Sequence, residues 1–212
     1  MNFIALVTYL TIMAITPGPN NLALASSGVN FGLKRTLPAL MGMALGLSSQ
    51  VAILALALGS MMALMESIKL WLALAGCLYL FWLSWHMAHA AEPGSDGKVS
   101  KGKPMGFASG VLFNWLNPKV WLMGFNVAIV FLPDSMPVWQ AGSLFFVVTF
   151  IITLPCIAVW AWGGEYIRRY LDSPRRLHLF NYSMGGMLAC TAAWLLVEML
   201  PAETMAQMSA MV

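Results

Sequence analysis

The sequence predicts an all-α integral membrane protein in which six transmembrane helices form two inverted three-helix repeats, with helices 1 and 4 broken at mid-membrane. Composition is the first reason, because 60% of the 212 residues are hydrophobic and 9% are charged, against about a quarter charged in ordinary soluble domains. The second is a series of long apolar segments with at most one charged residue each, and the third is a proline step inside two of them. A soluble globular enzyme is excluded, and so is a disordered chain, which needs low hydrophobicity and high charge.

Charged residues divide the chain into six apolar segments, each long enough to cross about 30 Å of hydrocarbon, which takes about 20 residues. Transmembrane helices are expected over 3–26, 38–63, 69–90, 106–131, 139–163 and 179–199. Continuous apolar runs of this length favour helices over the shorter alternating strands of a barrel. The first segment is expected to remain as a true span and not to be a signal peptide, because no cation precedes Lys34.

Lysine and arginine in the loops predict the orientation. Nine of them lie in the loops after spans 1, 3 and 5, and only Lys69 lies in the loops after spans 2 and 4. Because short cytoplasmic loops are rich in these residues, both termini are expected to face away from the cytoplasm. The net charge of +3 comes from these short loops and not from one basic face, so no nucleic-acid partner is predicted.

The whole chain, 1–212, is predicted to be a single transmembrane transporter domain. A polar linker at 92–104 separates a first repeat, 1–91, from a second repeat, 105–200, and a tail of 201–212 follows. Because each repeat has three spans, the second must lie upside down relative to the first. Inverted repeats with broken helices at corresponding positions are typical of transporters, and the breaks are the best sequence indication of the binding site.

The two proline steps, Thr16-Pro17 and Asn117-Pro118, lie near the middle of their segments and are 101 residues apart. Thr and Asn are good N-cap residues and proline is favoured at the first helical position, so each step is expected to start a new half-helix. Each half-helix would point free N–H groups and a partial positive charge into the bilayer centre. Two such ends would form a receptor for an anionic group such as a substrate carboxylate.

Lys119 is the one charged residue between Pro104 and Pro133. A cation at the bilayer midplane costs at least about 3 kcal/mol on insertion scales and marks a functional site. Burial and the half-helix dipole both disfavour its charged form, which would let it release a proton. We expect Lys119 to anchor a carboxylate, to carry protons, or both. The alternative is a lysine whose stem snorkels to the interface.

Polar residues beside the two steps complete the predicted substrate site. Their amides and the carbonyls freed by the helix breaks would bind an ammonium group, although the same amides could instead satisfy only the broken backbone. The predicted substrate-binding residues are Thr16, Pro17, Gly18, Pro19, Asn20, Asn21, Asn114, Asn117, Pro118 and Lys119. No catalytic residue, cofactor-binding residue or metal ligand is predicted.

The strings Thr16-Pro17-Gly18-Pro19-Asn20-Asn21 and Leu116-Asn117-Pro118-Lys119 resemble those of the LysE/RhtB family of bacterial amino-acid exporters, of the threonine, homoserine, leucine and cysteine type. The resemblance covers the whole chain. It implies a multi-pass protein of the bacterial inner membrane, with periplasmic termini, that exports amino acids or their derivatives by proton antiport. Family members that export lysine or arginine tend to carry an acidic residue soon after the second motif. Residues 120–124 have none, which favours a neutral or small polar substrate.

Two alternatives are an exporter of a metal or other ion and a membrane-embedded redox enzyme. A redox carrier needs paired cysteines, whereas Cys77, Cys156 and Cys190 lie on three different predicted spans. A metal exporter needs His, Cys or carboxylate clusters within its spans, and the sequence places none there. The expected partners are therefore an amino-acid substrate, protons and the lipid bilayer. Six spans are few to enclose a pathway, which is compatible with a homodimer.

Overall fold

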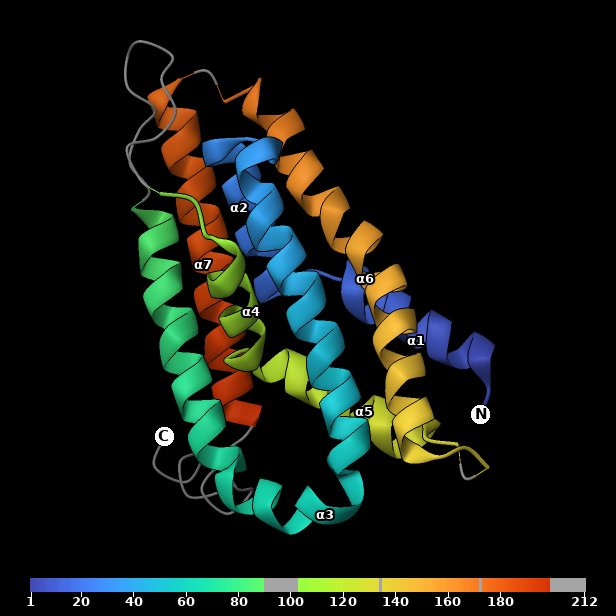
Figure 1. Cartoon of the computed structure of the whole chain (residues 1–212). Coiled ribbons are helices and arrows are strands. Elements are labelled where there is room, and N and C mark those ends of the chain that lie inside the picture. The colour runs from blue at the N-terminus through green and yellow to red at the C-terminus, as the bar shows by residue number, and fades with distance from the viewer. Residues whose placement is uncertain (90–102, 134, 172, 199–212) are drawn as a thin grey trace, which may run out of the picture.

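The computed structural model is all-helical in the part of the chain that it describes, residues 1–89, 103–133, 135–171 and 173–198, without the side chains of 58–70, 72, 73 and 198. Seven helices follow one another in these ranges (Figure 1): α1 (Phe3–Ile15), α2 (Pro19–Phe31), α3 (Leu33–Ala88), α4 (Phe107–Trp115), α5 (Pro118–Phe131), α6 (Val138–Arg168) and α7 (Pro174–Glu198). Of the predicted linker at 92–104, only 103 and 104 are described, and the predicted tail at 201–212 lies outside the described residues.

Helix α3 holds most of the second and third predicted spans. Its ribbon runs down through the middle of the view, reverses at the bottom and returns along the left edge, so that its two arms, Leu33–Ala57 and Leu74–Ala88, run in opposite directions (Figure 1). The connection expected between 63 and 69 is therefore a bend within a continuous helix and not a separate loop.

Several helices are long and apolar enough to cross a membrane. Among the described residues these are Leu33–Ala57, Val138–Arg168 and Pro174–Val197, and the pair α1–α2, bent by 49°, counts as a fourth. The second arm of α3 and helix α5 are apolar but shorter. The architecture is that of a helical membrane protein, while the count of six spans in two inverted repeats stays a prediction.

Glycines bring helices α2 and α6 into backbone contact. A Cβ atom on Gly28 would overlap the carbonyl oxygen of Ala161, and one on Gly164 would overlap that of Ala25. Small residues permit this close approach between membrane helices. At the end of α2, Gly32 has φ +83°, a left-handed conformation that favours glycine, and it lets the chain turn directly into α3.

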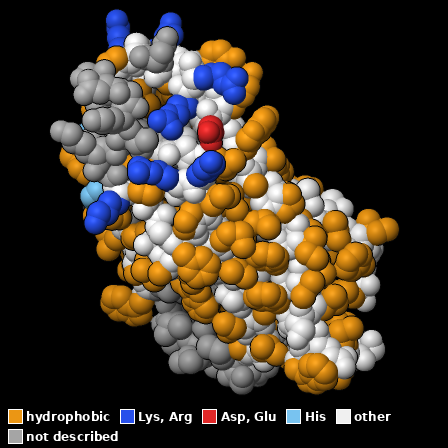
Figure 2. Space-filling model, turned by 45° about the horizontal axis from the view of Figure 1, so that its top comes forward, with side chains coloured by type: hydrophobic (Ala, Val, Ile, Leu, Met, Phe, Trp, Pro, Cys, Tyr) orange, Lys and Arg blue, Asp and Glu red, His pale blue; other side chains and the backbone are white. Residues whose placement is uncertain are grey.

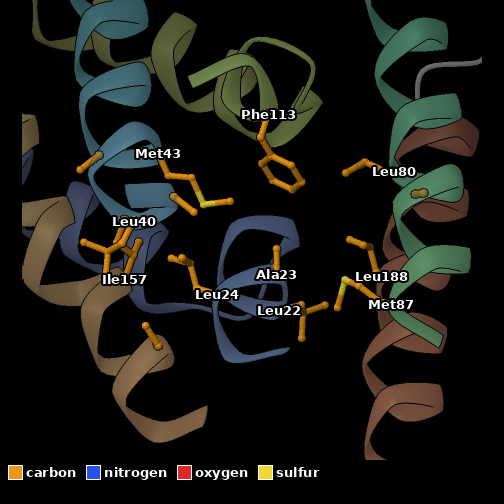
Figure 3. Close-up of a cluster of buried hydrophobic side chains, with 14 of the residues drawn as sticks. Leu22, Ala23, Leu24, Leu40, Met43, Leu80, Met87, Phe113, Ile157 and Leu188 are labelled. Carbon is orange, nitrogen blue, oxygen red and sulfur yellow. The ribbon is translucent and has the colours of Figure 1, made fainter. Parts of the chain in front are cut away.

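Two buried hydrophobic clusters fill the bundle. The first joins α2, α3, α4, α6 and α7, with Phe113 of α4 pointing between Met43 and Leu80 toward α2 (Figure 3). The second joins α1 to α3, α5 and α6 and includes Leu10 and Phe145. Members of both clusters, Ile157 of the first and Leu47, Val120 and Met123 of the second, line a pocket together with residues of the two helix breaks.

One end of the molecule is basic. Figure 2 shows Lys and Arg side chains gathered at that end, while hydrophobic side chains cover much of the rest of the visible face. The described cations near helix ends and loops are Lys34, Arg35, Lys103, Arg168, Arg169, Arg175 and Arg176. An acidic residue, Glu165, lies at the same end, and its carboxylate accepts a hydrogen bond from the backbone N–H of Leu33. Leu33 is the first residue of α3, and a negative charge is favourable at a helix N-terminus.

Candidate functional site

The first helix break differs in one detail from the sequence prediction. Thr16 is not the N-cap of a new half-helix but the C-cap of α1, with extended backbone at φ −65° and ψ 143°. Helix α2 begins at Pro19, and Gly18 is its N-cap. The reason is the second proline: a residue before proline avoids the helical region, so both Thr16 and Gly18 are extended, and the helix restarts only after Pro19.

The second break agrees with the prediction. Helix α4 ends at Trp115, and α5 begins at Pro118 with Asn117 as its N-cap. The Asn117 side chain accepts a hydrogen bond from the backbone N–H of Lys119 at 3.1 Å. It thereby satisfies one of the N–H groups that a helix start leaves without a partner.

Three buried asparagines join the two breaks. Asn20 Nδ2 donates to Asn114 Oδ1 at 2.7 Å, and Asn117 Nδ2 donates to Asn20 Oδ1 at 2.9 Å. Asn114 Nδ2 in turn donates to the carbonyl oxygen of Met43 on α3. The three residues are 0–8% exposed, and each uses both the oxygen and the nitrogen of its amide within the protein. Segments almost 100 residues apart in the chain are therefore linked side by side.

Lys119 reaches from the start of α5 to the end of α1. Its Nζ donates to Thr16 Oγ1 at 3.1 Å and lies 3.5 Å from the carbonyl oxygens of Thr16 and Pro17. The dipole of α5 opposes a cation in its first turn, but the C-terminal end of α1 favours one. Gly18 makes room for the side chain, because a Cβ atom there would lie 2.9 Å from Nζ.

Asn21 closes the break between α1 and α2. Its Nδ2 donates to the carbonyl oxygens of Ala14 at 2.9 Å and Thr16 at 2.7 Å, which are left without helical partners where α1 ends. Its Oδ1 is buried and has no hydrogen-bond partner among the described residues. The amide orientation follows from the two carbonyl oxygens that Nδ2 faces.

A pocket adjoins these groups, with about 340 Å³ of empty space including its open mouth. Six of the ten predicted site residues line it: Gly18, Pro19, Asn20, Asn21, Asn117 and Lys119. The remaining wall is apolar and consists of Met13, Ala14, Leu47, Val120, Met123 and Ile157.

The other four predicted residues lie next to the pocket lining. Thr16 and Pro17 contact the Lys119 ammonium group, Asn114 is bonded to Asn20, and Pro118 is the buried first residue of α5. These contacts gather all ten positions in one region around the two helix breaks. What they bind stays a prediction.

Gln50 supports the site, and the sequence analysis did not name it. It is fully buried on α3. With its amide oriented to satisfy both neighbours, Gln50 donates to the carbonyl oxygen of Asn114 at 3.1 Å and accepts from Trp121 Nε1 at 3.0 Å. A lone amide inside the charge-free segment 36–65 is the signal that would have pointed to it, because a polar group buried in lipid needs a partner.

Comparison with known proteins gives one consistent result. A family model described as LysE type translocator matches residues 11–199. A protein of Klebsiella pneumoniae named cysteine/O-acetylserine efflux protein is 32% identical over 198 residues, which cover 92% of this chain and 96% of the relative. Proteins of the same name from Salmonella paratyphi A and Escherichia coli K12 are 31% and 30% identical, over 76% of this chain and 82% of each relative. No solved structure matches.

Proposed function

The chain belongs to the LysE type translocator family, and from this premise we propose that it exports a small neutral amino acid, or a derivative of one, from the bacterial cytoplasm across the inner membrane. Family membership makes it a transporter and not an enzyme. The observation that carries the proposal is the meeting of two broken helices around Lys119, beside a pocket that the residues of both breaks line.

The substrate class follows from the charges around the pocket. Lys119 is the one charged side chain among the described residues that line it, so a substrate carboxylate has a partner and a second cationic group has none. A buried unpaired charge is strongly unfavourable, which argues against lysine or arginine as substrate. The relatives' printed names, cysteine and O-acetylserine efflux, support a small zwitterion without a charged side chain.

In the proposed binding mode, the substrate carboxylate pairs with the Lys119 ammonium group. The N-termini of α2 and α5 face the same pocket through Gly18, Pro19 and Asn117, and helix N-termini favour anions. The apolar wall, which includes Met13 and Met123, would receive a short uncharged side chain.

Proton exchange is the proposed driving force, with Lys119 as the proton carrier. The family's position in the inner membrane would give it access to the proton gradient. Substrate arrival and departure change the charge beside the Lys119 side chain, which would couple its protonation to transport. Lys119 would therefore alternate between a substrate-bound ammonium and a proton-releasing amine.

The proposed architecture has six spans in two inverted repeats, 1–91 and 105–200, and both termini in the periplasm. It is supported by the opposite directions of the broken pairs, since α1–α2 rises toward the basic end and α4–α5 descends from it (Figure 1). The gathering of Lys and Arg at that end (Figure 2) supports a cytoplasmic location for it. A homodimer is compatible with this arrangement.

The test uses purified protein in vesicles loaded with labelled amino acids, and efflux is followed with and without an inwardly directed proton gradient. We expect O-acetyl-L-serine and L-cysteine to leave faster than from protein-free vesicles, L-lysine not to do so, and the gradient to accelerate export. If no amino acid or derivative leaves faster than the protein-free control, the proposed function is wrong.

The matched variants are Lys119→Met and Lys103→Met. Both remove one lysine ammonium group, but Lys103 lies before α4, away from the pocket. We expect Lys119→Met to insert normally and to lose at least about 90% of export, and Lys103→Met to keep it. Full export by Lys119→Met would make that residue structural.

A further inference from the structure

Asn21 differs from the other asparagines of the site because its carbonyl oxygen is unused. The residue is 3% exposed and lines the pocket. Its Nδ2 holds two backbone oxygens, whereas its Oδ1 has no partner among the described residues. Asn20, Asn114 and Asn117 have both ends of their amides bonded within the protein. Of the four predicted amides, Asn21 alone has a buried acceptor left for a ligand.

An unpaired acceptor in the membrane interior needs a donor, because burial without one is costly and lipid supplies none. The pocket beside Asn21 has space for such a donor. Resting on the function proposed above, we propose that Asn21 Oδ1 binds the α-ammonium group of the substrate, next to oxygens that Lys119 occupies until the substrate arrives.

The contacts of Lys119 identify those oxygens. Its ammonium group lies on Thr16 Oγ1 and near the carbonyl oxygens of Thr16 and Pro17. Asn21 is bonded to the same Thr16 carbonyl, so the Lys119 ammonium and the Asn21 amide are held by one residue. These oxygens are at the C-terminal end of α1, where the helix dipole favours a cation. The lysine of the protein thus lies on a set of oxygens that suits an ammonium group.

Substrate binding then exchanges one ammonium for another. The substrate carboxylate draws Lys119 Nζ away from Thr16 and Pro17 through a charge-assisted hydrogen bond. The α-ammonium group of the same substrate takes the vacated oxygens and reaches Asn21 Oδ1. A zwitterion adds no net charge, so during this binding step the oxygens keep a cation and the Lys119 ammonium group keeps a partner.

The experiment measures how strongly the protein prefers a ligand that has the ammonium group. Efflux of labelled O-acetyl-L-serine from vesicles is inhibited either by unlabelled O-acetyl-L-serine or by 3-acetoxypropionate, which lacks only the α-ammonium group. The ratio of the two half-inhibitory concentrations does not depend on how much protein is folded. We expect a ratio of at least about ten in the wild type, a factor that corresponds to about 1.4 kcal/mol, and a ratio below about three in Asn21→Ala.

Two further variants separate binding from folding. Asn30→Ala is the matched control, because Asn30 is also a buried asparagine on α2 but pairs with Asn181 and Ser26 away from the pocket; its ratio should equal that of the wild type. Asn21→Asp loses the same two Nδ2 donations to the Ala14 and Thr16 carbonyl oxygens as Asn21→Ala but keeps an acceptor oxygen and adds negative charge. Its ratio should therefore equal or exceed the wild-type value, which separates loss of the acceptor from loss of the donor.

The outcomes distinguish this inference from the proposed function. If the wild type exports no amino acid, the proposed function fails. If it exports O-acetyl-L-serine but the ratio is near one, or the ratio is unchanged in Asn21→Ala, or it is lost in Asn21→Asp, export stands and the role of Asn21 is overturned. A ratio that falls in Asn21→Ala and is kept in Asn30→Ala and Asn21→Asp supports it.

Discussion

Replacing Asn20 with alanine removes the central link between the two helix breaks. In the wild type, Asn20 donates to Asn114 Oδ1 at 2.7 Å and accepts from Asn117 Nδ2 at 2.9 Å. In Asn20→Ala both neighbouring amides lose that partner in a region where Asn20 is only 8% exposed. The apolar clusters on either side are untouched, so we expect the variant to fold with a lower free energy of unfolding.

Two estimates bracket the size of the loss. A buried polar group left unpaired costs about 1–3 kcal/mol in soluble proteins, which gives about 2–6 kcal/mol for two groups. Hydrogen bonds between membrane helices contribute on average about 0.6 and at most about 1.7 kcal/mol, because the unfolded chain in the membrane also finds partners. The second estimate has the appropriate unfolded reference, so we expect a loss of about 1–3 kcal/mol.

The assay is unfolding in mixed micelles with increasing sodium dodecyl sulfate, followed by tryptophan fluorescence. Asn114→Ala and the double variant complete a double-mutant cycle, and we expect the double variant to lose about 0.5–1.5 kcal/mol less than the sum of the single losses. Asn20→Ala combined with Asn30→Ala is the control, because Asn30 bonds to Asn181 instead, and its loss should add. A coupling of zero between Asn20 and Asn114 would refute the bridge.

Three other substitutions test the packing around the site. Gly28→Val places a side chain against the Ala161 carbonyl on α6. It should destabilise the protein by about 2 kcal/mol or more, since overpacking costs about 1–3 kcal/mol. The same micelle titration measures the loss, and an unchanged midpoint would contradict the close contact. Gly18→Ala displaces the flexible end of Lys119, so export should fall several-fold in the vesicle assay at nearly unchanged stability; wild-type export would contradict this. Glu165→Gln keeps an acceptor for the Leu33 N–H group but removes the negative charge. In the same micelle titration its free energy of unfolding should fall by less than about 1 kcal/mol, and a larger fall would mean that the carboxylate does more than cap α3.

The membrane character of the protein, the positions of its helix breaks and the membership of Lys119 in the site could all be predicted from the sequence. Hydropathy and charge are summed over a contiguous segment, and a proline interrupts a helix wherever it occurs, so these features need no knowledge of the neighbours. Family membership followed in the same way, from two short motifs at the helix breaks. The count of six spans and the inverted repeats remain predictions.

Only the tertiary structure decided how the polar groups of the site are used. In the sequence Asn20 and Asn21 are adjacent amides of equal capacity. Residues almost 100 positions away bond both ends of Asn20, whereas the oxygen of Asn21 has no hydrogen-bond partner in the described part of the chain. Hydrogen-bond partners depend on which distant segments meet, and that is a property of the packed chain.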